Sequence, residues 1–455
     1  MGLPFSDAVR RRFGTGFWAL ADQGAVSLGN FMTQIILARN LSHTKYGVFA
    51  LIFGVLLFLF TCQSGLIAYP LSLEGASVGR AELRKVAFAA ALLTFLLAFP
   101  LSLLVLGATI ILHVAAITWA VVLAMLLWQL QETFRRALMS HLLHRAAIWG
   151  DVLSYGGQAV FVWLLARYGA LSLQRVFVVV ALTSALAALL QSLQVGWSAT
   201  PLRAVLATAR KYWSLGKWAL LTGMTESGVR QAFPWMLALL YSPAEAASFQ
   251  AVMNLVGVSH PIIFGTNNLV IPAAADAKNQ RGTAAAFRTS SWYGALAGLL
   301  VLPFFTALFM WPHLALTLFY GSLSPYAILG TGLRLASVAY MLVALTAVLL
   351  AFLYGVGRSR FAFEASIGGT LVAIIPASFL MVYYGIVGAV AGILLVAFGK
   401  LVFGGALVVR TLRLDANVPS GRRSSSAGNS NNPLGKSGAA ASPAIRVEGG
   451  RIGDA

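Results

Sequence analysis

The chain contains a series of apolar runs, each long enough to cross a lipid bilayer as a helix. A hydrocarbon core about 30 Å thick needs about 20 apolar residues per helix, and only internally hydrogen-bonded backbone is stable inside it. Charged residues make up 10% of the chain, against about 25% in a typical soluble domain. We therefore predict an all-α polytopic membrane protein with about twelve transmembrane helices. The expected spans are 16–38, 47–69, 86–108, 114–134, 147–167, 175–195, 217–240, 247–271, 290–311, 328–353, 361–382 and 386–409.

The second half of the chain repeats residues of the first half at a constant offset of 200 positions. Trp18-Ala19-Leu20 recurs as Trp218-Ala219-Leu220. The register then holds without a gap in the pairs Ser27 and Ser227, Leu37 and Leu237, Ala38 and Ala238, Ser42 and Ser242, Phe49 and Phe249, and Gly65 and Gly265. Membrane proteins built from two such halves are commonly transporters with a site at the repeat interface. The repeat predicts two six-helix lobes, 1–200 and 201–410, around a central cavity.

Basic residues are concentrated in alternate loops between the expected helices. Lys and Arg accumulate in cytoplasmic loops, so their distribution sets the orientation. One set of loops holds Arg10, Arg11, Arg12, Arg80, Arg84, Lys85, Arg135, Arg136, Arg145, Arg203, Arg210, Lys211, Lys217, Lys278, Arg281, Arg288, Arg358 and Arg360. The intervening loops hold only Arg39, Lys45, Arg167 and Arg175. The pattern predicts that both termini lie in the cytoplasm. It also accounts for the net charge of +19 without a nucleic-acid partner.

The sequence lacks the patterns expected of an enzyme. Its 13 carboxylates include no two aspartates within three positions of each other, which excludes the paired-acid motif of metal-dependent sugar transferases. Gly435-Lys436-Ser437 imitates the end of a phosphate-binding loop, but Ser430 occupies the position of the required glycine. We expect no cofactor, no metal and no ATP site. Residues 411–455 are rich in Ser, Gly, Asn, Ala and Pro, a composition that predicts a disordered cytoplasmic tail.

Polar residues inside the expected helices are the best candidates for a substrate or ion pathway. In the first helix they form one stripe, Gln23, Ser27, Asn30 and Gln34, with Asp22 at its edge. In the seventh helix Glu226 and Arg230 occupy the corresponding part of the repeat. Asp22 and Glu226 each lie about 14 Å into the membrane at the rise of an α-helix. Charges at such depth cost about 2.5–3.5 kcal/mol each, so we expect them to face a hydrated interior.

Two interpretations of the Glu226 and Arg230 pair stay open: a structural ion pair at i, i+4, or a contact for substrate. Asp22 has no basic neighbour one turn away, which favours a functional role. Weaker candidates are Asp151 on the fifth helix, with Arg145 as an alternative structural partner, and Asn254 near the break expected at His260-Pro261. Arg334 and Lys400 complete the intramembrane charges, while Glu132 with Arg136 and Arg360 with Glu364 are expected to be structural pairs.

The loop after the first helix resembles a known family. Residues 38–47, Ala-Arg-Asn-Leu-Ser-His-Thr-Lys-Tyr-Gly, are similar to the Ala-Arg-x-Leu-Ser-x-x-x-Tyr-Gly stretch of bacterial polysaccharide transporters, the O-antigen and exopolysaccharide flippases. These belong to the multidrug, oligosaccharidyl-lipid and polysaccharide exporter superfamily. The resemblance implies two six-helix bundles, V-shaped around a central cavity. It also implies a lipid-linked oligosaccharide, carried on undecaprenyl diphosphate to the periplasmic leaflet.

Within that family, a diphosphate would suit forked, permanently charged arginines such as Arg230 and Arg334. Asp22 and Glu226 would suit coupling to protons or sodium. The first alternative is a drug/cation antiporter of the same superfamily, whose cavity should be acidic and aromatic, whereas loops and lumen here are basic. The second is a membrane polysaccharide polymerase or ligase, which should carry a longer outward loop than the connection around 311–327.

Overall fold

The computed structural model describes residues 5–416, without the side chains of 5–17, 19, 20, 264, 268 and 416. Every regular element within this range is helical, as the apolar runs predict. Contacts divide the chain into one unit that ends at Leu407 and a second that begins at Val408. The predicted tail falls largely outside the described residues, and its first residues, 411–416, form the end of the last helix. The fold described below is that of the first unit.

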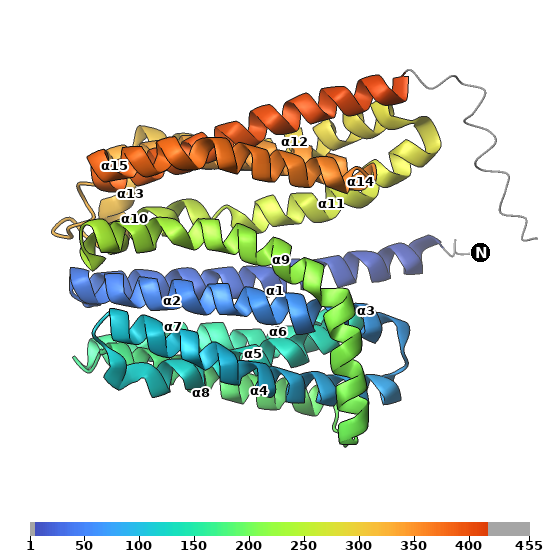
Figure 1. The fold of residues 1–455 in the computed structure, drawn as a ribbon, viewed down its shortest axis with the longest axis horizontal. Coiled ribbons are helices and arrows are strands. Elements are labelled where there is room, and N and C mark those ends of the chain that lie inside the picture. Colours follow the sequence, from blue (N-terminus) through green and yellow to red (C-terminus); the bar gives the residue numbers. More distant parts are fainter. Residues whose placement is uncertain (1–4, 417–455) are drawn as a thin grey trace, which may run out of the picture. The chain divides into compact units, whose positions relative to one another are not determined.

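The first half of the chain forms six helical passes (Figure 1). Several passes are built from two or three consecutive helical segments joined without a loop. In chain order the elements are α1 (Phe5–Asn40), α2 (His43–Gln63), η1 (Ser64–Ala68), α3 (Tyr69–Ser77), α4 (Arg80–Ile111), η2 (Ala115–Ile117), α5 (Thr118–Ser140), α6 (His144–Asp151), η3 (Val152–Gly156), α7 (Gly157–Arg167) and α8 (Leu173–Val195). The side chain of Ser42 caps α2, and that of Ser172 caps α8. The break expected at 108–114 lies at Leu112–Val114, where His113 adopts a φ of 55°.

The second half also forms six passes. Its elements are α9 (Leu202–Leu240), α10 (Pro243–Gly257), α11 (His260–Arg281), α12 (Thr283–Met310), α13 (Pro312–Tyr320), α14 (Gly330–Gly355) and α15 (Ser359–Ala416). The eighth pass is interrupted between α10 and α11, next to His260 as expected. The eleventh and twelfth passes are joined within α15 at Gly385, whose φ of 54° and ψ of −128° are accessible to glycine. The short helix α13 was not predicted.

Seven helices are long and apolar enough to span a membrane by length and composition, or eight if the bent pair α10 and α11 is one span. The number is below twelve for two physical reasons. The long α15 counts once although it turns back at Gly385. In addition, three passes do not meet the criterion because they carry polar residues: α1, α9 and the pass formed by α6, η3 and α7, which contains Asp151 and Gln158. Polar spans are common where a helix faces a hydrated interior.

Small residues let the two halves approach closely along α2 and η1. A methyl group added at Gly65 would lie 2.8 Å from the backbone of Leu220 in α9, and one at Gly47 would lie 1.7 Å from the carbonyl oxygen of Pro243 in α10. Close backbone approach through glycine is the usual way in which membrane helices pack. At Gly265, the repeat equivalent of Gly65, a methyl group would meet no described atom within 4 Å.

Candidate transport pathway

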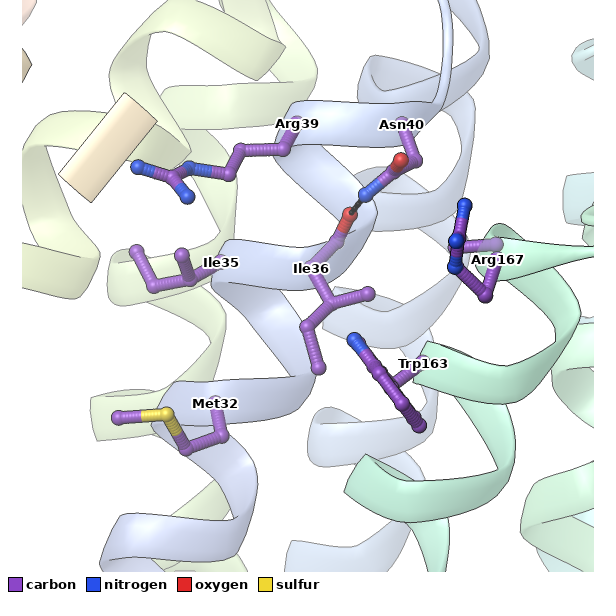
Figure 2. Close-up of a pocket in the computed structure, with 8 residues that line it drawn as sticks. Met32, Ile35, Ile36, Arg39, Asn40, Trp163 and Arg167 are labelled. Carbon is purple, nitrogen blue, oxygen red and sulfur yellow. Dashed lines mark hydrogen bonds between the residues drawn. The ribbon is translucent and has the colours of Figure 1, made fainter. Parts of the chain in front are cut away.

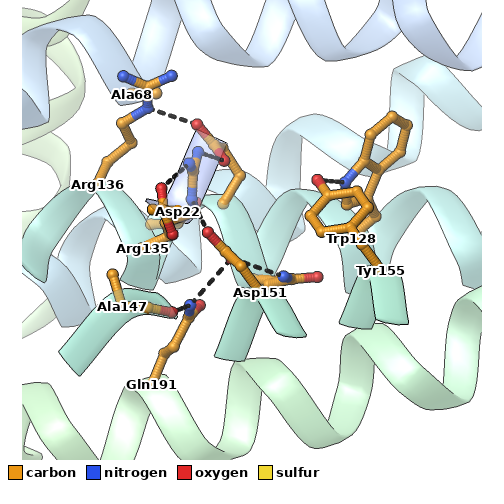
Figure 3. Close-up of polar contacts among 12 residues, drawn as sticks. Asp22, Ala68, Trp128, Arg135, Arg136, Ala147, Asp151, Tyr155 and Gln191 are labelled. Carbon is orange, nitrogen blue, oxygen red and sulfur yellow. Dashed lines mark hydrogen bonds and ion pairs between the residues drawn. The ribbon is translucent and has the colours of Figure 1, made fainter. Parts of the chain in front are cut away.

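The centre of the first half contains an arginine that binds three carboxylates. Arg135, on α5, donates from Nη2 to Asp22 Oδ2 on α1 (2.7 Å), from Nε to Asp151 Oδ2 on α6 (2.5 Å) and from Nη1 to Glu132 Oε2 (3.2 Å). Glu132 also accepts a hydrogen bond from Arg136. The side chains of Asp22 and Asp151 are fully buried, and that of Arg135 is 7% exposed. We call Asp22, Glu132, Arg135 and Asp151 the carboxylate cluster (Figure 3).

Amides and aromatic side chains surround this cluster. Gln131 and Gln191 each donate to Asp151 Oδ1 over 3.3 Å, so both oxygens of this carboxylate are bonded. Trp128 donates to the hydroxyl of Tyr155 over 2.9 Å on the neighbouring turn (Figure 3). By contrast, the buried Oδ1 of Asp22 accepts no hydrogen bond from the described residues. A buried charge needs a full set of partners, so this oxygen is the incompletely satisfied position of the cluster.

The cluster depends on an irregular turn between α6 and α7. Val152–Gly156 is a π-helical segment that follows Asp151 directly and contains Tyr155. Such segments are rare and are often found at functional positions in helices. Gly29 of α1 packs on this turn, because a methyl group there would lie 2.7 Å from the backbone of Tyr155. The close contact brings α1 near enough for Asp22 to reach Arg135.

The structure therefore joins two residues that the sequence proposed separately, Asp22 and Asp151. Their shared partner is Arg135, which the sequence interpretation placed among the basic loop residues; that placement is wrong, because Arg135 is buried in α5. The alternative partner Arg145 instead lies over the ring of Trp18, 5.6 Å from its centroid. A signal was present in the sequence, since Gln129, Gln131 and Glu132 make one turn of α5 unusually polar beside Arg135.

The remaining polar stripe of α1 runs from exposed to buried. Gln23 is exposed, Ser27 and Asn30 are partly buried, and Gln34 is buried. Gln34 Oε1 accepts a hydrogen bond from the hydroxyl of Tyr46 over 3.1 Å, and this hydroxyl accepts one from Asn254 Nδ2 over 2.8 Å. Gln34 and Asn254 are thus brought together through Tyr46, which the sequence analysis did not select.

These contacts belong to a wider junction between the halves, where α1 ends and α2 and α10 begin. Arg39 donates from Nε to the carbonyl oxygen of Phe319 (2.6 Å) and from Nη2 to that of Leu318 (2.7 Å), in the last turn of α13. His43 Nε2 lies 2.9 Å from Ser248 Oγ on α10. The ring of Phe31 meets Phe319 edge-on at 5.3 Å. We call this set of contacts, with Gln34, Tyr46 and Asn254, the outer junction.

The second half has its own group of charges. Glu226 and Arg230, both exposed on α9, form no ion pair with each other in the described part of the chain. Both lie within electrostatic range of Lys400 on α15, and Arg230 also interacts with His260 and Tyr340. We call Glu226, Arg230 and Lys400 the charged group of the second half. Arg334 is not part of it: its Nε donates to the carbonyl oxygen of Phe309 over 3.2 Å, at the end of α12.

No protein-family profile matches the chain, and no curated protein matches it. Solved structures do. An inward-facing multidrug resistance MATE family transporter of the MOP superfamily is 16% identical, with 87% of this chain and 96% of that chain covered at a TM-score of 0.70. The eukaryotic MATE transporter AtDTX14 is 16% identical over 89% and 96% at 0.65. An outward-facing multidrug resistance MATE family transporter is 14% identical over 88% and 95% at 0.61.

At sequence identities this low, the similarity to these structures establishes the fold alone. The protein is accordingly an all-α, multi-pass membrane protein with the twelve-helix, two-lobe fold of the MATE family transporters.

Proposed function

We propose that the protein is an alternating-access transporter that moves a lipid-linked oligosaccharide across the inner membrane. The distribution of paired and unpaired charges carries this proposal. The buried acids of the first half are bound by Arg135, whereas Arg230 and Lys400 form no ion pair with the described residues. The charge available to a substrate is therefore mainly positive. A diphosphate-linked sugar carries the complementary charge.

The conformation of the chain is consistent with loading from the cytoplasmic side. The outer junction closes the halves at the end where α1 meets α13. The match to the inward-facing MATE transporter, at a TM-score of 0.70, exceeds the match to the outward-facing one, at 0.61. The predicted orientation makes the junction periplasmic. In this state, cargo would reach Arg230 from the cytoplasmic leaflet, and opening of the junction would release it outside.

The carboxylate cluster is a candidate for ion coupling. It holds three acids against Arg135 and the neighbouring Arg136, so one negative charge is in excess. Asp22 Oδ1 lacks a partner among the described residues and could accept a proton or contribute to a sodium site. A change in charge at Asp22 would alter its bond to Arg135 and hence the packing of α1. We propose this route as the link between an ion gradient and the outer junction.

The proposal is tested by reconstituting the full chain in vesicles with a fluorescent, short-chain lipid diphosphate-linked sugar. A membrane-impermeant quencher measures how much of the label has moved from the inner to the outer leaflet of the vesicles. We expect Arg230→Gln and Lys400→Gln each to slow movement at least about tenfold, the effect of losing about 1.4 kcal/mol of binding. Arg360→Gln is the matched control, because Arg360 is a highly exposed surface residue paired with Glu364. Unchanged movement in both Arg230→Gln and Lys400→Gln would exclude this cargo.

A drug/cation antiporter is the second candidate, and the fold comparisons favour it more than the first. Two of the similar structures carry the words multidrug resistance in their descriptions. This activity requires an acidic group free to bind an organic cation, and Glu226, which is exposed and forms no ion pair with the described residues, could serve. The same vesicles discriminate the candidates. Ethidium efflux driven by a proton or sodium gradient and abolished by Glu226→Gln, without movement of the diphosphate-linked sugar, would replace the first proposal by the second.

A further inference from the structure

A groove lies between the last turns of α1 and α7, at the same end of the fold as the outer junction (Figure 2). Its volume is about 600 Å³, within the range of small-molecule sites. Met32, Ile35 and Ile36 of α1 form its apolar floor, and Trp163 forms one wall. Arg39 and Arg167 stand on opposite sides of it (Figure 2). The groove is distinct from the carboxylate cluster and from the charged group of the second half.

The groove is positively charged, although the end of the protein on which it lies carries few cations. Only Arg39, Lys45, Arg167 and Arg175 lie in the loops that the sequence predicts to be periplasmic. Two of these four cations line the groove. Arg39 is held by the carbonyl oxygens of α13, which leaves its Nη1 edge available. Arg167 is exposed and forms no hydrogen bond or ion pair among the described residues, so its whole guanidinium is open to a ligand.

The surroundings of the groove are those of a lipid-facing surface. On α7, Val160, Phe161 and Trp163 are each at least half exposed, and on α1 Leu28 is 60% exposed. Leu28 and Met32 continue the apolar floor down α1, one turn apart. Tryptophan with arginine at the end of a span is typical of the membrane interface. An apolar track that leads to a cationic end matches a molecule with an acyl chain and an anionic headgroup.

We propose that this groove binds an anionic phospholipid of the outer leaflet, with its phosphate at Arg167 and its acyl chain along Met32 and Leu28. Trp163 packs against the glycerol region, since its ring lies between the arginine and the apolar floor (Figure 2). Arg39 adds to the positive potential from the opposite side. A zwitterionic lipid fits less well, because its ammonium group would lie beside two guanidinium groups. This site does not depend on which cargo the protein transports.

The test is native mass spectrometry of the purified full chain with phosphatidylglycerol or phosphatidylcholine added in detergent. We expect the wild-type chain to retain phosphatidylglycerol preferentially. Removing one cation near a membrane surface costs about 1 kcal/mol, so Arg167→Gln should weaken phosphatidylglycerol binding about fivefold. Lys45→Gln is the matched control, being an exposed cation at the same end outside the groove, and it should leave binding unchanged. Equal losses in both variants, or no lipid preference in the wild type, would overturn the proposal.

A second measurement needs no substitution. Photoactivatable phosphatidylglycerol, reconstituted with the wild-type chain and mapped by peptide mass spectrometry, should label residues 28–40 and 160–167. Labelling confined to other segments would contradict the site, whatever the stability of Arg167→Gln. A third experiment adds undecaprenyl diphosphate as a competitor at the concentration of phosphatidylglycerol. If it displaces phosphatidylglycerol at equal concentration, the groove belongs to the cargo pathway and the assignment to a phospholipid is wrong.

Discussion

Nη2 of Arg135 lies 2.7 Å from Oδ2 of Asp22 and joins α5 to α1 in the interior of the first half. The same guanidinium binds Asp151 and Glu132, so it is the common partner of all three carboxylates of the cluster. Breaking a buried ion pair by removing one partner costs about 3–5 kcal/mol, because the other charge stays buried. Arg135 is therefore the residue on which the packing of α1, α5 and α6 depends.

The first prediction concerns stability. Arg135→Gln should lower the unfolding midpoint of the purified protein and its abundance in the membrane, because three carboxylates lose their common cation. Arg145→Gln is the control, since Arg145 stacks on Trp18 and forms no ion pair among the described residues. Thermal unfolding followed by intrinsic fluorescence measures the difference. A midpoint for Arg135→Gln equal to that of the control would mean that the cluster contributes little to folding.

The second prediction separates function from folding at Asp22. Asp22→Asn keeps an oxygen for Arg135 and removes one of three acids, so the protein should reach the membrane at normal levels. Its transport should be lost, or should no longer respond to a proton or sodium gradient. Transport in vesicles with and without each gradient, normalised to protein content, makes the comparison. Gradient-dependent transport at the wild-type rate would remove Asp22 from the coupling site.

The third prediction concerns Glu226 and Arg230. Because the structure gives them no mutual ion pair, their roles should be separable. Arg230→Gln should reduce movement of a diphosphate-linked sugar at least about tenfold, the equivalent of about 1.4 kcal/mol. The double variant Glu226→Gln with Arg230→Gln should be no more active than Arg230→Gln alone. Recovery of transport in the double variant would identify a structural pair and leave Arg230 without a direct role in binding.

The fourth prediction addresses the outer junction. Tyr46→Phe removes the hydroxyl that joins Gln34 to Asn254, a loss of about 0.5–1.5 kcal/mol per hydrogen bond. The junction should therefore open more often. Spin labels at Thr44 and Leu323, both exposed near the junction, should show a larger population at long distance. Tyr69→Phe is the control, since the exposed Tyr69 side chain has no hydrogen-bond partner among the described residues. Identical distance distributions would show that the junction does not govern opening.

The helices could be predicted from the sequence because their signals are local. Apolar runs in the sequence predicted twelve passes, and His260 and Gly385 mark real interruptions. The short α13 was missed because its nine residues are apolar without being long enough to span, so no length criterion selects them. Helices α1 and α9 begin earlier than predicted, since polar residues extend both helices ahead of their apolar parts.

The candidate site was less accessible to prediction because it depends on contacts between distant segments. Helical spacing identified Asp22 and Gln34 on one stripe, yet their partners, Arg135 and Tyr46, lie on other helices. Charge bias assigned Arg135 to a loop, since a count of basic residues does not distinguish a buried arginine from a loop arginine. The roles proposed for the site residues remain predictions.

The different surroundings of Gly65 and Gly265 have a consequence for how the two halves can evolve. Both glycines occupy the same place in the internal repeat, but only Gly65 is pressed against a neighbouring backbone, that of Leu220. Alanine should therefore be tolerated at Gly265 and harmful at Gly65. Two positions that correspond in the repeat therefore differ in how strongly packing constrains them. Gly265 still matches Gly65 without such a contact, so a substitution at Gly265 would end the match at no cost in packing, whereas one at Gly65 would force α9 away from its neighbour.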